Sequence, residues 1–270
     1  MCEKALLEYL ETKRLVFPRF YFVSSADLLD ILSNGRDPAK VGKHLTKLFD
    51  SIAKLEMKTN DDGSPSKMAH TMIAKDGEAV PLLEECLCDG QVEIWLNEVM
   101  SKMRATVRNE FSKCMETYTS TPRDKWLELY PAQVALAGTQ IFWTSEVNAA
   151  FTSLEEGFEP AMKNYYKKQI AQLNVLITML LANLSKGARQ KVMTICTIDV
   201  HSRDTVAKMI QQKVESKSSF NWQSQLRHRW DNVEADCFAN ICDAQFRYSH
   251  EYLGNTPRLV ITPLTDRCYR

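Results

Sequence analysis

Residues 91–118 read QVEIWLNEVMSKMRATVRNEFSKCMETY. Apolar side chains recur here every three or four positions, the spacing that places them on one face of an α-helix. That face comprises Val92, Trp95, Leu96, Val99, Met103, Val107, Phe111, Cys114 and Tyr118. Charged residues such as Lys102, Arg108 and Glu116 fall on the opposite side. The stretch therefore predicts one long amphipathic helix whose apolar face covers a core.

The chain on the C-terminal side of this stretch continues the helical pattern. Glycine and proline number nine each in 270 residues, fewer than the average of about 12% for the two together. A β-sandwich or barrel needs frequent turns, so this shortage favours long helices. Gly187 is expected to end the second of four further predicted helices, which cover residues 132–151, 159–184, 189–200 and 205–214.

The N-terminal side of the stretch is mixed. Residues 16–23 are aromatic and β-branched and predict a strand. Pro38 predicts the start of a helix through residue 55, because apolar residues recur there at spacings of three or four. Two short extended pieces flank Asp76-Gly77, a dipeptide typical of a β-hairpin turn.

The C-terminal region changes to a period of two. Apolar and polar residues alternate over residues 220–231 and again over 238–252, which predicts two antiparallel strands. Residues 258–262 predict a last short strand. The predicted fold class is therefore mainly α, with a short β-hairpin in the N-terminal third and a β segment at the C-terminal end.

Charge and hydropathy exclude several classes of protein. Thirty-four basic residues balance 34 acidic ones, whereas a protein that grips a nucleic-acid backbone usually carries net positive charge. The most apolar run, residues 175–182, is shorter than the roughly 20 residues of a membrane span. The first residues are not followed by an apolar segment typical of a secretory signal. Eight cysteines without such a signal indicate reduced thiols in a cytosolic protein.

Three stretches imitate functional motifs. Residues 35–44 resemble a phosphate-binding loop, but six residues separate Gly35 from Gly42 where four are needed, and His44 replaces the metal-holding Ser or Thr. A helix start at Pro38 is the simpler interpretation. Asp199, His201 and Ser202 are the residue types of a catalytic triad. Residues this close in sequence seldom converge on one substrate atom, so a helix cap at Asp199 or Ser202 is favoured over a catalytic role.

The third imitation is the basic and aromatic segment 222–230, which could stack single-stranded bases. Its alternation is equally typical of a sheet that covers a core. Zinc binding is disfavoured as well, because neither of the closest thiol pairs, at Cys86/Cys88 and Cys237/Cys242, has the CxxC spacing. The sequence therefore predicts neither a metal site nor an autonomous active site.

Short stretches along nearly the whole chain resemble dynein heavy chains, most closely those of axonemal outer arms. These stretches are FPRFYFVS (17–24), DLLDILS (27–33), QVEIWL (91–96), YPAQV (130–134), QIFWT (140–144), TICTIDVH (194–201), ICDAQF (241–246) and YLGNTPRLVITPLTDRCY (252–269). The resemblance implies that residues 1–245 form the C-terminal part of the linker, an elongated helical lever that bends and straightens in the ATP cycle. Residues 246–270 would be the entry strand of the first AAA+ ATPase module.

The same resemblance implies where nucleotide would bind in an intact motor. It would place Leu259, Val260, Pro263 and Leu264 near the adenine of ATP, and the phosphate loop after Tyr269. The cofactors of the parent motor would be ATP and Mg. This chain alone holds no phosphate loop, so we expect it to have no catalytic residues, no cofactor and no ATPase activity of its own.

The implied partners are the AAA+ ring of the same heavy chain and, through the complex, dynein intermediate and light chains and microtubules. Neither nucleic acid nor membrane is an expected partner, and the implied location is the cytoskeleton of a ciliary or flagellar axoneme. Two other hypotheses stay open: a helical adaptor or scaffold that shares dynein ancestry without motor function, and an independent enzyme.

Overall fold

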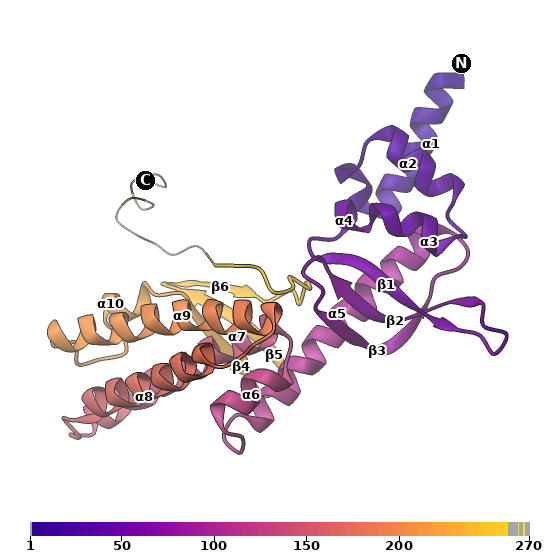
Figure 1. The fold of residues 1–270 in the computed structure, drawn as a ribbon. Helices are drawn as coiled ribbons and strands as arrows, with labels where there is room; N and C mark the ends of the chain where they lie inside the picture. The colour runs from indigo at the N-terminus through magenta and orange to yellow at the C-terminus, as the bar shows by residue number, and fades with distance from the viewer. Residues whose placement is uncertain (1, 259–263, 265–266, 268–270) are drawn as a thin grey trace. The chain divides into compact units, whose positions relative to one another are not determined.

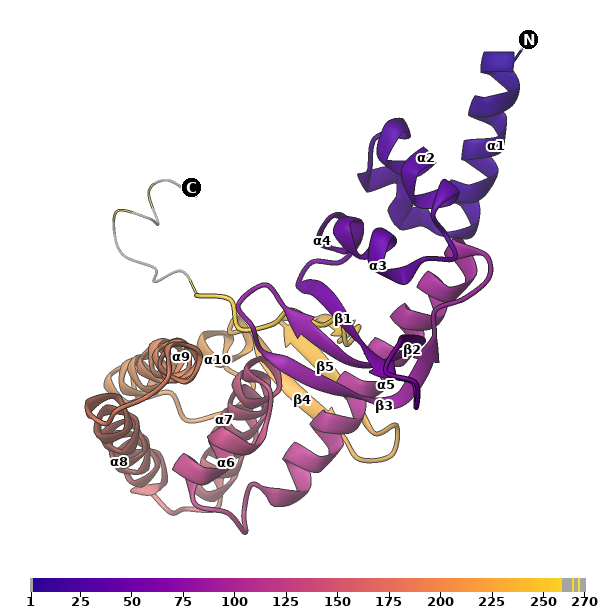
Figure 2. The same cartoon turned by 45° about the vertical axis from the view of Figure 1, so that its right-hand side comes forward.

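The computed structural model describes residues 2–258 together with 264 and 267. The chain forms two units: unit 1 is Met1–Asn109 with His250–Gly254, and unit 2 is Glu110–Ser249 with Asn255–Arg270. Figures 1 and 2 show the elements of both. The predicted fold class is confirmed: helices dominate, and each unit contains one antiparallel sheet of three strands.

Unit 1 combines short helices, a sheet and most of the long helix. Its elements are α1 (Cys2–Val16), the 3-10 helix η1 (Pro18–Phe22), α2 (Ser25–Ser33), α3 (Pro38–Val41), the 3-10 helix η2 (Gly42–His44), α4 (Leu45–Leu48), β1 (Ile52–Thr59), β2 (Pro65–Ala74), β3 (Ala79–Leu87) and α5 (Val92–Thr117). The strand order is β1-β2-β3. Helix α5 lies along the sheet (Figures 1 and 2), and Thr106 of α5 accepts a hydrogen bond from the backbone N–H of Leu83 in β3 at 2.9 Å.

Two sequence predictions in unit 1 are confirmed. Helix α5 covers nearly the whole predicted stretch, and the apolar residues of its stripe from Val92 to Cys114 are buried. The predicted hairpin at Asp76-Gly77 joins β2 to β3, and Gly77 has φ +87°, a conformation that glycine adopts without steric cost.

The predicted strand at residues 16–23 is wrong, because this segment forms the 3-10 helix η1 after Phe17. Phe17 and Phe20 are both buried, with ring centroids 5.0 Å apart. A spacing of three residues brings them to one side of a 3-10 turn, and Pro18 occupies the first turn, where it is favoured.

The helix predicted through residue 55 is also too long. Helical structure ends at Leu48, and β1 begins at Ile52. Ile52 and Leu55 are both buried although they lie three residues apart in a strand. The pairing of β1 with β2 is irregular between Ile52 and Lys54, and such a bulge turns successive side chains toward the same face. The bulge therefore imitates helical spacing.

Unit 2 is a group of helices with a small sheet. Its elements are the end of α5, α6 (Arg123–Leu129), α7 (Ala132–Glu155), α8 (Ala161–Leu181), α9 (Lys186–Gln211), α10 (Phe220–Gln223), β4 (Arg227–Asp231), β5 (Asp236–Ile241) and β6 (Ala244–Arg247). Helices α8 and α9 lie side by side, and α7 contacts both of them and β4 (Figure 2). Helix α7 is buried over most of its length. A Cβ at Gly138 of α7 would stand 2.8 Å from Cys114 Sγ, so the close approach here requires glycine.

Four predictions in unit 2 need correction. Residues 189–200 and 205–211 belong to one helix, α9, because neither glycine nor proline interrupts them, and this helix ends at Gln211 rather than at the predicted residue 214. Gly187 lies in the first turn of α9 rather than ending α8, and Ser185 caps α9 by accepting from the N–H of Ala188 at 3.2 Å. The strand predicted at 220–231 forms only as β4, because Trp222 lies in the short helix α10, fully buried in an aromatic cluster. The antiparallel pairing with the next segment is confirmed. The single strand predicted at 238–252 is wrong, because this segment folds back on itself as β5 and β6, and residues 248–252 lie in neither strand. The last predicted strand, residues 258–262, falls almost wholly outside the described residues.

Candidate functional site

The strap, defined as residues His250–Gly254, belongs to unit 1 although more than 140 positions separate it from Asn109. Glu251 accepts two hydrogen bonds from the Arg19 guanidinium, at 2.7 Å from Nη1 and 2.6 Å from Nη2. Both side chains are about four-fifths buried. A bidentate Arg–carboxylate pair fixes orientation as well as distance, so it holds the strap to η1 in a defined geometry.

Arg19 is itself held by two further contacts. Its Nη1 donates to the backbone oxygen of Leu48 at 3.1 Å. Its guanidinium carbon lies 5.0 Å from the ring centroid of Phe49, within the range of a cation–π interaction. Because the rotamer of Arg19 is fixed from both sides, Glu251 meets a preorganised partner.

The second anchor of the strap is Tyr252, whose ring is almost completely buried. Its hydroxyl donates to Glu78 Oε2 at 2.7 Å. Burial and then the negative charge of Glu78 raise the pKa of Tyr252 above its ordinary value. The phenol therefore stays protonated at neutral pH and keeps donating to Glu78, at the start of β3.

The backbone of the strap is shaped for this position. Gly254 has φ +61°, and a Cβ there would lie 3.3 Å from the Cβ atoms of Ala74 and Ser51. His250 also has a positive φ, 55°, which is uncommon for a residue other than glycine. Such conformations persist only where the surroundings impose them. The strap is therefore a built part of unit 1.

The structure describes one of the four residues predicted to lie near adenine. Leu259, Val260 and Pro263 fall outside the described residues. Leu264 is 72% exposed. Just before this group, Asn255 in unit 2 donates from its side-chain amide to the backbone oxygen of Gly187 at 2.9 Å.

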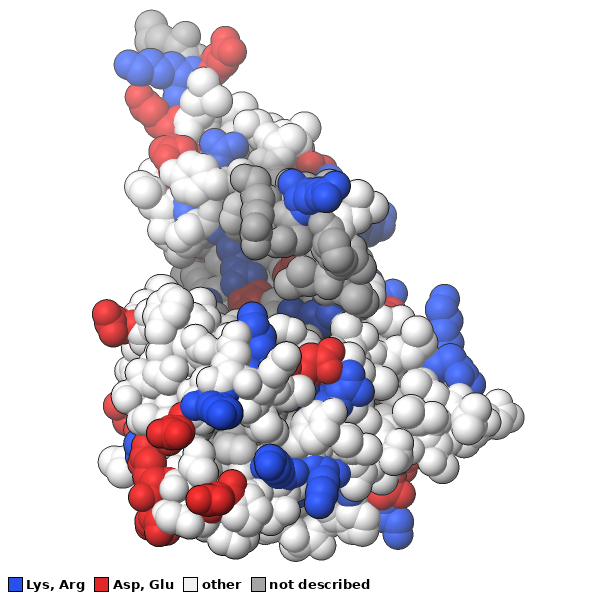
Figure 3. Space-filling model, turned by 90° about the vertical axis from the view of Figure 1, so that its left-hand side faces the viewer, with Lys and Arg blue, Asp and Glu red and all other residues white. Residues whose placement is uncertain are grey.

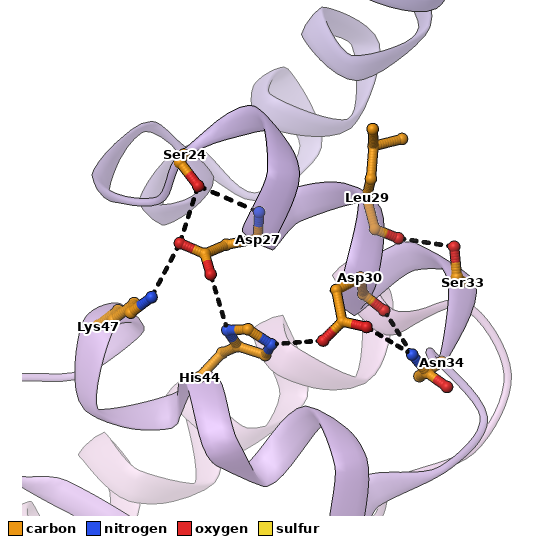
Figure 4. A network of polar contacts seen from close by, with 8 residues as sticks. All are labelled: Ser24, Asp27, Leu29, Asp30, Ser33, Asn34, His44 and Lys47. Carbon is orange, nitrogen blue, oxygen red and sulfur yellow. Dashed lines mark hydrogen bonds and ion pairs between the residues drawn. The ribbon is translucent and has the colours of Figure 1, made fainter.

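The imitation phosphate loop is occupied by structural contacts. Asp37 accepts from the N–H groups of Ala39 and Lys40 at 3.2 and 3.4 Å, so it caps α3. The helix start predicted at Pro38 is confirmed. His44 lies between two carboxylates of α2, with Nε2 at 2.8 Å from Asp30 and Nδ1 at 3.6 Å from Asp27 (Figure 4).

Asp27 links this network to α4. It pairs with Lys47 at 2.8 Å, and the pKa of Asp27 is lowered by that hydrogen bond first and then by the one from Ser24. The network therefore joins α2 to η2 and α4 (Figure 4).

The imitation triad also has a structural role. Asp199 lies within α9 and pairs with Arg123 of α6 at 2.5 Å, with both side chains about nine-tenths buried. Burial raises the pKa of Asp199, and the charge of Arg123 opposes that shift. Asp199 does not cap a helix, contrary to the prediction, because α9 is continuous here.

The described residues contain neither a metal-sized cluster of ligands nor a helix that could span a membrane. Three or more His, Cys, Asp or Glu side chains do not gather in any metal-sized cluster there, and within the same residues each helix is too short or too polar to span a bilayer. Basic and acidic side chains are both spread over the face drawn in Figure 3, in keeping with the balanced charge.

Sequence reasoning missed the contacts of the strap. Arg19 and Glu251 are 232 positions apart, and no local pattern couples residues at that distance. Tyr252 stood in a segment predicted as a strand. The one available signal was Gly254, because glycine adopts a positive φ without steric cost.

Comparison with known proteins identifies the class to which these two units belong. Residues 1–114 match the family described as "Dynein heavy chain, N-terminal region 2". Residues 248–270 match the family described as "Hydrolytic ATP binding site of dynein motor region". The chain therefore belongs to the dynein heavy chain family, as the sequence motifs indicated.

The similar relatives are axonemal heavy chains. The chain is 64% identical over 269 residues to "Dynein beta chain, ciliary" of Heliocidaris crassispina and 64% identical over 269 residues to "Dynein axonemal heavy chain 9" of Homo sapiens. It is 49% identical over 268 residues to "Dynein beta chain, flagellar outer arm" of Chlamydomonas reinhardtii. The matches cover 99–100% of this chain and 6% of each relative, so the chain spans a small part of their length.

Proposed function

We propose that this chain acts as a mechanical linker segment of an axonemal dynein heavy chain, a lever that bends and straightens with the ATP cycle to drive microtubule-based movement. Residues 1–245 would form the linker part, and 246–270 the entry to the first AAA+ module. The proposal rests on the family relationship and on one structural observation, the seating of the strap.

That observation concerns where the second family match begins. The strap lies inside residues 248–270, which match the ATP-binding region, yet its contacts belong to unit 1, which coincides closely with the first match at 1–114. The Arg19–Glu251 pair and the Tyr252–Glu78 hydrogen bond would thus carry force from the start of the ATPase region into unit 1. A lever requires such an attachment at its base.

The nucleotide contacts belong to the proposal as well. Leu259, Val260, Pro263 and Leu264 would lie near adenine in an intact heavy chain, where ATP and Mg are the cofactors. The 270 residues alone would not hydrolyse ATP, since their sequence has no Gly-x-x-x-x-Gly-Lys-Ser/Thr to cradle the phosphates. The partners would be the AAA+ ring, the intermediate and light chains and microtubules, and the location a ciliary or flagellar axoneme.

The test uses an intact heavy chain with Glu251→Ala. Loss of a charged hydrogen-bonded partner costs about 1.5–3 kcal/mol, which should loosen the strap without touching the nucleotide. We expect microtubule gliding speed to fall more than ATP turnover. Glu84→Ala is the matched control, because Glu84 makes an exposed pair with Lys102 in the same unit; it should leave both quantities unchanged.

Two results would contradict the proposal. A fall in turnover in strict proportion to speed would mean that the strap supports the ATPase and does not transmit force. Unchanged gliding in the Glu251→Ala motor would remove the strap as the base of a lever.

A further inference from the structure

Unit 2 contains a buried group of polar side chains around the Arg123–Asp199 ion pair. Four atoms of this group are buried and have no hydrogen-bond partner among the described residues: Arg123 Nε, Thr139 Oγ1, Trp143 Nε1 and Gln169 Oε1. They come from three helices, α6, α7 and α8. A buried polar atom left unsatisfied costs about 1–3 kcal/mol, so four of them in one place require an explanation.

The four side chains line one common cavity, together with Asp199 and other residues of unit 2. Its volume is about 10 Å³. A single water molecule requires about 10–15 Å³ and between two and four polar partners. The cavity therefore has the size and the lining of a site for one water.

We infer that this cavity is a binding site for one structural water molecule. The bonding capacities match. Arg123 Nε and Trp143 Nε1 can only donate, Gln169 Oε1 can only accept, and the Thr139 hydroxyl can do either. A water molecule accepts two hydrogen bonds and donates two, so it can accept from Arg123 and Trp143 and donate to Gln169 and Thr139.

The lining disfavours an ion of either sign. An anion would face the carboxylates of Glu146 and Asp199, which line the same cavity. A cation would face the guanidinium of Arg123 and the indole N–H of Trp143, neither of which has a lone pair to offer. A neutral molecule that both donates and accepts satisfies both sets of neighbours.

The bound water would add a connection among helices that already share the Lys168–Glu146 pair between α8 and α7. It would link Arg123 of α6 to Thr139 and Trp143 of α7 and to Gln169 of α8, while the other end of the Arg123 guanidinium already pairs with Asp199 of α9. All four helices would then meet in one hydrogen-bonded network. This inference is independent of the proposed linker function.

The test compares Thr139→Val with Thr144→Val in the full chain. Both threonines lie on α7 and both are 5% exposed. Only Thr144 already has a partner, the backbone oxygen of Gln140 at 3.1 Å. Magnetic relaxation dispersion of water ¹⁷O counts long-lived buried waters, and a high-resolution crystal structure locates them. We expect one such water within hydrogen-bond distance of Trp143 Nε1 and Gln169 Oε1, present in the wild type and in Thr144→Val and lost or more rapidly exchanging in Thr139→Val.

Unfolding equilibria give a second readout. If the water is bound, Thr139→Val removes a satisfied hydrogen bond and should raise the unfolding equilibrium constant roughly 3- to 10-fold. If the site is dry, the same change removes an unsatisfied hydroxyl and leaves stability equal or higher. A wild-type crystal structure without water in the cavity, or with an ion there, would overturn the inference, and so would a Thr139→Val variant whose stability equals or exceeds that of the wild type.

Discussion

Replacing Trp222 by alanine probes the buried hydrophobic cluster of unit 2 to which Trp222 belongs. Trp222 is 0% exposed. Its ring meets that of Trp143 edge-on, with centroids 5.0 Å apart and planes inclined by 74°. Its indole Nε1 donates to Asn148 Oδ1 at 2.9 Å. Both the packing and the hydrogen bond would be lost in Trp222→Ala.

The magnitude follows from the buried area. A tryptophan side chain buries about 150–250 Å², which at about 25 cal/mol per Å² corresponds to about 4–6 kcal/mol. Alanine retains part of this area, while the cavity left behind and the unpaired Asn148 add a cost. We therefore expect the free energy of unfolding of unit 2 to fall by about 3–5 kcal/mol, the range found for large aromatic-to-alanine changes in cores.

The assay is urea unfolding followed by far-UV circular dichroism, together with hydrogen exchange of the α7 and α9 amides. Exchange reports on unit 2 by itself, which matters because a chain of two units need not unfold in one step. Phe220→Ala is the matched control: Phe220 lies in the same short helix but is 73% exposed, and its replacement should change stability by less than about 0.5 kcal/mol.

A loss of less than about 1 kcal/mol in Trp222→Ala would refute the reasoning, because no fully buried indole could then occupy that cluster. Equal losses in the two variants would refute it as well. Trp222→Phe should lie between the wild type and Trp222→Ala, since it keeps one aromatic ring in the cluster but loses the packing of the second ring and the bond to Asn148.

Three further predictions concern single residues. In a urea titration, Gly254→Ala should lower the free energy of unfolding of unit 1 by about 1–3 kcal/mol, because φ is +61° and a Cβ would lie 3.3 Å from its neighbours. The control is Gly42→Ala, which should be neutral because the space around Gly42 is open. Burial lowers the pKa of His228 to about 4, so between about pH 6.5 and 4 only the unfolded chain binds this proton. The free energy of unfolding of unit 2 should therefore fall by up to about 1.4 kcal/mol per pH unit as the pH falls through this range. A His228→Gln variant with the same dependence of stability on pH would contradict this assignment. Burial raises the pKa of Cys237 to about 12, while Cys242 is exposed. Iodoacetamide should therefore label Cys242 before Cys237, as measured by mass spectrometry, and equal labelling rates of the two thiols would disprove the burial of Cys237.

The sequence predicted those elements whose pattern is set by local geometry. Helix α5 was located to within a residue at each end, because its apolar stripe continues along the 26 residues of the helix. The two failures in unit 1 have different causes. At η1 the aromatic and β-branched composition predicted a strand, whereas Phe17 and Phe20 are buried by a 3-10 turn. At the bulge of β1, buried residues three positions apart imitate helical spacing, so the period alone cannot distinguish the two structures.

The contacts of the candidate site could not be predicted from the sequence. Motif resemblance pointed to the segment after residue 245. The contacts that hold this segment come from Arg19 and Glu78, and no local pattern pairs either residue with the strap. Likewise, Arg123 and Gln169 occur among charged and polar neighbours typical of solvent-facing helix positions. Only the assembled helices bring their unpaired atoms to a single cavity.

The late position of the strap in the chain has a consequence for biosynthesis. Unit 1 is complete only with His250–Gly254, and residues 110–249, which are 140 in number, are made between its two parts. At about 5–20 residues per second, a ribosome needs roughly 7–28 s to cross that interval. During this time the strap, which later contacts Arg19 and buries the Tyr252 ring in unit 1, has not yet been translated. A nascent chain halted at residue 245 would hold residues 1–109 of unit 1 without the strap. This is the stage at which a chaperone would meet the apolar surface that the Tyr252 ring later covers.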